Sequence, residues 1–319
     1  MSAIVCTSRA GSGDITQTVK TARFANPTGL ALDRKGNLYV ADSTHGIIRK
    51  ITPAGEVSTL AGRDRDRGNY PDGTGNQATF DSPTYLAIDG ADNLYTGKLF
   101  GDRIRKITPA GVVTTLAAKP RELHGIAIDH AGSLYFVDEN CVRKVSPEGK
   151  LKTIVGAPQP EESGPAPGSV SPFQHLGGVA IDSAGNVFVT DGYTIRKVTP
   201  SGEISTVAGA SGKSGYVDAT GSAARFYDPT NLTFDGTDDL YVADKRTVRK
   251  ITPDGVVSTV AGKPTLGAYN KGGFEWVSGI ALDKAGNIYV ADSNAALIRT
   301  ITSDGAVNTL AGKYKDTDE

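Results

Sequence analysis

One sequence unit returns six times along this chain of 319 residues, and this repetition restricts the folds that the chain can adopt. The segment "RKITPAGEVSTLAG", which begins at Arg49, returns almost unchanged at Arg105 and with small changes at Arg196 and Arg249. The six copies align on an aspartate that ends an apolar run, at Asp33, Asp89, Asp129, Asp182, Asp235 and Asp283. The spacing between these aspartates is uneven, which indicates equal cores joined by loops of different length and argues against a solenoid of fixed repeat length.

Each copy has the pattern of four short β-strands. An apolar run is followed by a Gly/Asn turn such as "DRKGN", a second run such as "LYVAD", a third such as "IIRKI", a "TPAG" turn and a fourth run such as "VSTLAG". Helical periodicity never persists, and Gly, Pro, Asp and Asn separate runs rich in β-branched and aromatic residues. Because the runs are apolar on both faces, each four-stranded sheet must be covered on both sides, which radial packing achieves. The sequence therefore predicts an all-β, six-bladed β-propeller of antiparallel blades.

The stretch "PTGLALDRKGNLYVADSTHGIIRKITPAGEVSTLAG" also resembles the NHL-repeat family, and the likeness covers nearly the whole chain. The resemblance supports the propeller fold, but it leaves function open because one fold serves many functions. We expect a single domain over 1–319, with blades near 24–62, 80–118, 120–156, 173–209, 226–262 and 274–312. The surplus segment "AIVCTSR", at 3–9, is expected to close the ring by pairing at the last blade.

Composition excludes some classes of partner. The chain has 35 acidic and 34 basic residues, so no net field draws it to nucleic acid or to an anionic membrane. Cys6 and Cys141 are too few for a disulfide framework and are expected to be free thiols. No apolar run approaches the length of a membrane helix. We expect a soluble monomer that binds neither membranes nor nucleic acid, and that is either cytoplasmic or secreted after removal of a signal peptide.

Residues that repeat in every blade are expected to be scaffold, because a functional site seldom needs equal copies of one group. Aspartate closes the second run in five blades, and arginine begins the "RKI" run in all six. We expect these residues to pair at the blade ends. The Gly- and Asp-rich loops "GNYPDGTGNQATFDSP" and "SGYVDATGSAARFYDP" lack the ligand spacing of a calcium loop or a phosphate loop and are expected to be blade connections.

Departures from the repeat predict where the site lies. In blade two the aspartate becomes Lys98, which we expect to face Asp102. The residues just before the inner strand of each blade form the lip of the channel, and in blades three and four this lip carries the imidazoles of His124 and His175. The upper face should carry the site, because its loops vary while the lower turns are short and uniform. The expected catalytic residues are His124, His175, Glu122 and Lys98. The expected ligand-binding residues are Tyr85, Tyr193, Asp228, Asn231 and Trp276.

Two classes of function remain open at this point. The first is a binding module that holds a small molecule, a peptide or a protein at the top mouth of the central channel. The second is a lyase or hydrolase at the same mouth, which the resemblance implies because amidating lyases and lactonase-like hydrolases are similar propellers. Two imidazoles and a carboxylate can hold one divalent metal, so His124, His175 and Glu122 are the candidate ligands for a zinc or calcium ion.

Overall fold

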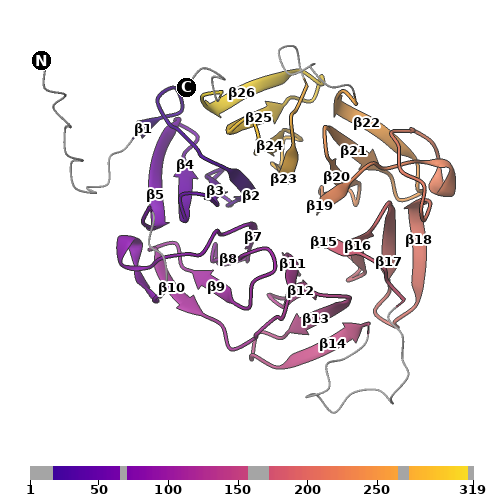
Figure 1. The fold of residues 1–319 in the computed structure, drawn as a ribbon, viewed down its shortest axis with the longest axis horizontal. Helices are drawn as coiled ribbons and strands as arrows, with labels where there is room; N and C mark the ends of the chain where they lie inside the picture. Colours follow the sequence, from indigo (N-terminus) through magenta and orange to yellow (C-terminus); the bar gives the residue numbers. More distant parts are fainter. Residues whose placement is uncertain (1–16, 65–69, 157–171, 265–272, 315–319) are drawn as a thin grey trace, which may run out of the picture.

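The computed structural model describes residues 17–64, 70–156, 172–264 and 273–314. Within these ranges, six antiparallel sheets are arranged as blades around a central axis (Figure 1). The four main strands of each blade follow one another in chain order from the innermost strand outward. The predicted fold is therefore confirmed. Apart from two single-turn 3₁₀ segments, η1 (Gly75–Gln77) and η2 (Gly221–Ala223), the assigned elements are all strands.

The blades take their four main strands from one repeat each. Blade one is β2 (Pro27–Leu32), β3 (Leu38–Asp42), β4 (Ile47–Ile51) and β5 (Glu56–Gly62), and blade two is β7 (Tyr85–Ile88), β8 (Leu94–Gly97), β9 (Ile104–Ile107) and β10 (Val112–Thr115). Blade three is β11 (Leu123–Ile128), β12 (Leu134–Asp138), β13 (Cys141–Val145) and β14 (Leu151–Val155), and blade four is β15 (Leu176–Ile181), β16 (Val187–Asp191), β17 (Thr194–Val198) and β18 (Ile204–Gly209). Blade five is β19 (Pro229–Phe234), β20 (Leu240–Asp244), β21 (Thr247–Ile251) and β22 (Val257–Gly262), and blade six is β23 (Val277–Leu282), β24 (Ile288–Asp292), β25 (Leu297–Ile301) and β26 (Val307–Gly312).

Two short strands extend the outer edges of the first two blades. β1 (Gln17–Thr18) pairs with β5, and β6 (Gly73–Thr74) pairs with β10, both antiparallel. The closing strand expected at 3–9 lies outside the described residues. Blade six has four strands of its own, and in the described part of the chain the ring closes by side-chain packing between blades one and six, with Leu30 and Leu38 against Ala281 and Ala291. No helix in that part of the chain is long and apolar enough to cross a membrane.

The aligned aspartates hold the lower turns. In blade one, the Asp33 carboxylate accepts hydrogen bonds from the backbone N–H of Lys35 and Asn37, from the Asn37 amide and from the Tyr39 hydroxyl. Burial opposes ionisation of this carboxyl group, yet the hydrogen bonds keep the pKa of Asp33 below its ordinary value. Blade six repeats the arrangement at Asp283. These aspartates are therefore turn-forming residues.

The expected pairing of aspartate and arginine at the blade ends is confirmed in blades three to six. The Nη1–Oδ2 distances are 2.9 Å for Arg143–Asp138, 3.1 Å for Arg196–Asp191, 3.3 Å for Arg249–Asp244 and 4.0 Å for Arg299–Asp292. In blade one, Asp42 accepts from the His45 ring nitrogen at 2.8 Å. The Gly- and Asp-rich loops serve the same scaffold, since Asp72 and Asp218 from these loops pair with Arg105 and Arg249.

Glycine at the start of the inner strand lets neighbouring blades approach closely. A Cβ on Gly279 would lie 2.0 Å from the Thr28 carbonyl oxygen of blade one, and a Cβ on Gly29 would lie 2.7 Å from backbone atoms of blade two. The aligned position holds Tyr85 in blade two and Asn231 in blade five. These two departures place large polar side chains at the central channel.

Candidate functional site

A cavity of about 700 Å³ occupies the mouth of the channel, where the loops before the inner strands meet the loops after the second strands. All six blades contribute to its wall. Six of the nine predicted site residues line it: Tyr85, Lys98, His124, His175, Asp228 and Trp276. The remaining three, Glu122, Tyr193 and Asn231, are not part of its lining.

The scaffold aspartates determine which side chains reach the lip. In blade four, the Asp191 Oδ1 atom accepts the backbone N–H of Gln174 at 2.8 Å and of His175 at 2.9 Å. The equivalent aspartates fix the backbone of Asn26, Glu122, Asp228 and Trp276 in the same way. Because the aspartate bonds only to backbone N–H groups there, the side chain at each lip position is free to differ from blade to blade.

His124 is the most enclosed of the lip imidazoles. Its ring meets the Phe100 ring edge to face, with the centroids 5.0 Å apart, and its Nε2 atom lies 3.8 Å from Glu122 Oε2. Burial lowers the pKa of His124 below its ordinary value, although the Glu122 carboxylate opposes this shift. His124 is therefore neutral at pH 7 and can either donate or accept a hydrogen bond at the cavity wall.

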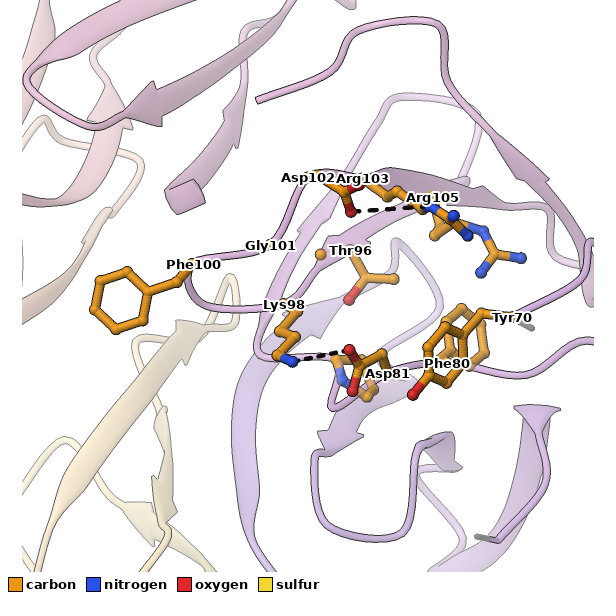
Figure 2. A pocket seen from close by; sticks show the side chains of 12 residues that line it. Tyr70, Phe80, Asp81, Thr96, Lys98, Phe100, Gly101, Asp102, Arg103 and Arg105 are labelled. Atoms are coloured by element: carbon orange, nitrogen blue, oxygen red, sulfur yellow. Dashed lines mark hydrogen bonds and ion pairs between the residues drawn. The ribbon is translucent and has the colours of Figure 1, made fainter. Parts of the chain in front are cut away.

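Blade two differs from the others at this lip. The Lys98 ammonium forms an ion pair with Asp81 at 2.8 Å, so the expectation that it faces Asp102 was wrong (Figure 2). Burial raises the pKa of the Tyr85 hydroxyl, which makes no hydrogen bond to any other described residue. A tyrosine that remains protonated and unpaired beside the cavity is an available hydrogen-bond donor.

Blades five and six place a lysine against two aromatic rings next to the cavity. The Lys245 Nζ atom lies 4.4 Å from the Tyr227 ring centroid and 4.9 Å from that of Trp276. Tyr216 stacks on Tyr227 at 5.2 Å. Burial raises the pKa of the neighbouring Asp228, while the positive charge of Lys245 opposes that rise. Of this cluster, Trp276 and Asp228 line the cavity, whereas Lys245, Tyr216 and Tyr227 are not part of its lining.

The predicted metal set is not assembled in the part of the chain that the structure describes. Among those residues, no group of three or more His, Cys, Asp or Glu side chains is arranged to hold a metal ion. His124 is held by Phe100 and Glu122, while Glu122 has a side chain that is 53% exposed. The geometry of these residues supports hydrogen bonding and proton transfer better than metal binding.

The structure also separates residues that the sequence had grouped. Asn231 lies deeper along the channel, where its Oδ1 atom accepts the backbone N–H of Ile280 at 3.4 Å. Tyr193 is exposed in the loop between β16 and β17 of blade four. The sequence analysis missed Phe100, which follows the second strand of blade two and lines the cavity. The unusual "LFGD" of blade two was the signal for Phe100.

Comparisons with known proteins agree with the fold. The family model described as the Teneurin NHL domain matches residues 5–96 and 169–268, together more than half of the chain. Zebrafish (Danio rerio) Teneurin-3 is 27% identical over 85% of this chain, and Arabidopsis thaliana Protein SUPPRESSOR OF QUENCHING 1, chloroplastic, is 27% identical over 70%. The chain spans only 12% and 24% of the lengths of these two relatives.

Solved structures share the propeller at lower identity. A streptogramin B lyase superposes with a TM-score of 0.59 at 16% identity, covering 98% of this chain and 90% of that chain. An auxiliary nutrient binding protein from Bacteroides thetaiotaomicron superposes with a TM-score of 0.68 at 18% identity, covering 90% of this chain and 70% of that chain. At these identities the likeness shows the fold alone. The family match and the six-bladed architecture together show that this chain belongs to the teneurin NHL domain family.

Proposed function

We propose that this propeller is a binding module whose ligand occupies the cavity at the channel mouth. The observation that carries the proposal is the cavity itself: about 700 Å³, with a wall that differs on every blade. Pockets for small molecules usually measure about 300–1,000 Å³ and combine apolar faces with a few convergent polar groups. The cavity matches both criteria, so a small molecule is the favoured ligand, and a peptide inserting one or two side chains is the alternative occupant.

The wall indicates which chemistry the ligand has. Tyr85 and Trp276 offer ring surface, and the neutral His124 and the Tyr85 hydroxyl offer hydrogen bonds without a net charge. Lys98 is already neutralised by Asp81. We therefore expect a ligand that is largely neutral, with an aromatic or other flat apolar part and several hydrogen-bonding groups. The nutrient-binding function named for one structural neighbour supports a binding role for this type of propeller.

The chain carries its own reporter for this proposal, because Trp276 is its single tryptophan and lines the cavity. Compounds that raise the melting temperature in a screen should also shift the Trp276 emission in a saturable way. His124→Gln and Tyr85→Phe should each weaken binding about 5- to 150-fold, because a hydrogen bond lost in a desolvated pocket costs about 1–3 kcal/mol.

His130→Gln is the matched control, since His130 lies in a lower turn at the opposite end of the channel. It should leave the affinity unchanged. Binding that persists in both mouth variants, or that is lost with His130→Gln, contradicts the placement of the ligand. A ligand that binds with no change in Trp276 emission also argues against the mouth.

His124 supports a second candidate function, acid–base catalysis of a lyase or hydrolase type. A neutral imidazole whose Nε2 atom is 3.8 Å from a carboxylate, at the wall of a cavity, is suited to accept a proton from a bound substrate. The discriminating measurement is mass spectrometry of each ligand after incubation with the protein. Turnover that disappears in His124→Gln while binding persists favours the enzyme, and an unchanged ligand favours the binding module.

A further inference from the structure

Blade two contains the arginine of the repeat without the aspartate that this arginine meets in other blades. In blades three, four and five, the aspartate that closes the second strand places Oδ2 within 2.9–3.3 Å of the arginine Nη1 atom. In blade two that position holds Lys98, which turns to Asp81 instead. The buried arginine of this blade, Arg105, is only 4% exposed.

Arg249 of blade five shows which groups the terminal nitrogens of this arginine can hold in the scaffold. Its Nη2 atom donates to the Val217 carbonyl oxygen at 3.1 Å and to Asp218 at 2.6 Å. Its Nη1 atom donates to the Arg225 carbonyl oxygen at 3.0 Å and to Asp244 at 3.3 Å. One buried guanidinium at this position therefore holds two carboxylates at once.

Arg105 reproduces that set with one carboxylate missing. Its Nη2 atom donates to the Pro71 carbonyl oxygen at 3.0 Å and to Asp72 at 2.7 Å, and its Nη1 atom donates to the Thr79 carbonyl oxygen at 3.0 Å. Within the described residues, no acceptor takes the second Nη1 hydrogen, which Asp244 takes in blade five. Arg105 can therefore accept one further carboxylate.

Thr96 is the second departure at the same place. It lies opposite Arg105 in the pairing of β8 with β9, so the two side chains share one face of the blade. The aligned residues of the other blades are apolar: Val40, Phe136, Val189, Val242 and Val290. Thr96 is fully buried, and its hydroxyl has no hydrogen-bond partner in the described structure. The scaffold gives no reason for a hydroxyl at this position.

A cavity of about 280 Å³ lies beside these two residues (Figure 2). Thr96 and Arg105 form part of its wall, together with the Lys98–Asp81 ion pair and the rings of Phe80 and Tyr70. Phe80 already stacks on the guanidinium of Arg105, with its centroid 5.3 Å away. The cavity thus combines two unsatisfied polar groups with an aromatic surface.

We propose that this blade-two pocket binds a small carboxylate, whose oxygens take the place of the missing aspartate. One oxygen accepts from Arg105 Nη1 and the other from the Thr96 hydroxyl, while the carbon skeleton rests against Phe80 and Tyr70. The other blades favour a carboxylate over phosphate or sulfate, because in blades three, four and five the group that meets Nη1 at this place is an aspartate carboxylate with a single charge. Asp72 and Asp81 close by disfavour a dianion.

The test is a titration of the full chain with sodium acetate, propanoate and benzoate, with ionic strength held constant by sodium chloride and with phosphate and sulfate as separate arms. We expect a saturable rise in melting temperature and a shift of the Arg105 side-chain NMR signals with the carboxylates. Equal stabilisation by chloride, or binding of phosphate and sulfate without binding of carboxylates, overturns the proposal.

Variants that restore the pattern of other blades make the test specific. Thr96→Val should weaken acetate or propanoate binding about 10-fold, and Thr233→Val, a partly buried threonine outside the pocket, should not. The double variant Asp81→Ala with Lys98→Asp restores the residues of blade one and supplies an internal carboxylate, so it should lose carboxylate binding altogether. Unchanged affinity in Thr96→Val or in the folded double variant contradicts the proposal.

Discussion

The buried hydroxyl of Thr96 leads to a prediction that reverses the usual effect of a core substitution. Thr96→Val replaces this hydroxyl by a methyl group of similar size at a position where the aligned Val40, Val242 and Val290 are fully buried. Leaving a buried polar group without a partner costs about 1–3 kcal/mol. Because the hydroxyl has no partner in the described structure, the variant should be more stable than the parent by about that amount.

The expected shift in melting temperature follows from the size of the chain. Unfolding entropy of about 2.1 cal/mol/K per residue gives roughly 0.67 kcal/mol/K for 319 residues, so 1–3 kcal/mol corresponds to a rise of about 1.5–4.5 °C. Equilibrium urea denaturation and calorimetry in a carboxylate-free buffer measure this change. Adding acetate should reduce the difference, because the parent gains more from the ligand than the variant does.

Val242→Thr is the matched reverse experiment, since it places the same hydroxyl at the aligned position of blade five, where Arg249 already has its aspartate. This variant should lose about 1–3 kcal/mol. If Thr96→Val instead lowers the stability by more than about 1 kcal/mol, the hydroxyl has a hydrogen-bond partner and the reasoning is refuted.

Further predictions concern the histidines, the buried arginines and the free thiol. A hydrogen bond to a carboxylate raises the pKa of His45, so its stabilisation is complete below the unfolded pKa of 6.5 and is lost as pH rises through the folded value. Burial lowers the pKa of His124, so the contribution of this neutral imidazole to folding stability is present above pH 6.5 and is lost as pH falls toward the folded pKa. NMR titration should show a raised pKa for His45 and a lowered pKa for His124. Arg249→Leu should lower the free energy of unfolding by about 3–5 kcal/mol in urea denaturation, because it leaves the buried Asp244 unpaired. Arg105→Leu should lower it less, because blade two has no aspartate at the equivalent position, and an equal loss would contradict this interpretation. Burial raises the pKa of Cys141 to about 12, so with the other cysteine replaced by serine the native protein should react with a thiol reagent only after denaturation.

The fold could be predicted from the sequence because every repeat contains the same pattern of turn and strand residues. The Asp33 carboxylate folds its turn through hydrogen bonds to residues within six positions along the chain, and Asp283 does the same in blade six. Such contacts depend on spacing alone. Six independent copies of one pattern also made the number of blades readable without coordinates.

The site was only partly predictable, because its groups come from different blades and their neighbours depend on loop geometry. Comparing aligned lip positions identified His124, His175, Asp228 and Trp276, all of which line the cavity. The partner of Lys98 could not be found in this way. Asp102 is closer to Lys98 in sequence, yet the loop before the inner strand brings Asp81 to its ammonium group.

Thr96 shows how a departure can be visible in the sequence and still be misread. Thr96 in "LYTGK" stands where most blades have valine. Threonine has a similar volume and a similar preference for β-strands, so strand propensity does not mark the position as unusual. Its meaning depends on what the hydroxyl meets, and only the described structure shows that it meets no acceptor beside Arg105. Breaks in the repeat are therefore informative when a polar group is introduced and its partner is absent.

The repeated aspartate explains how one scaffold can carry a different wall on every blade. At the lip it bonds to backbone N–H groups, as Asp191 does to His175, so the side chain presented to the cavity contributes nothing to the pairing. A lip residue can therefore change without loss of the blade. Blade two is the exception because the aspartate itself is replaced by Lys98, which pairs with Asp81 beside a second cavity. If the two proposed sites bind ligands, recognition and scaffold stability are separable at five lip positions and coupled at the sixth, where substitutions that restore the repeat should stabilise the protein and remove the proposed carboxylate site.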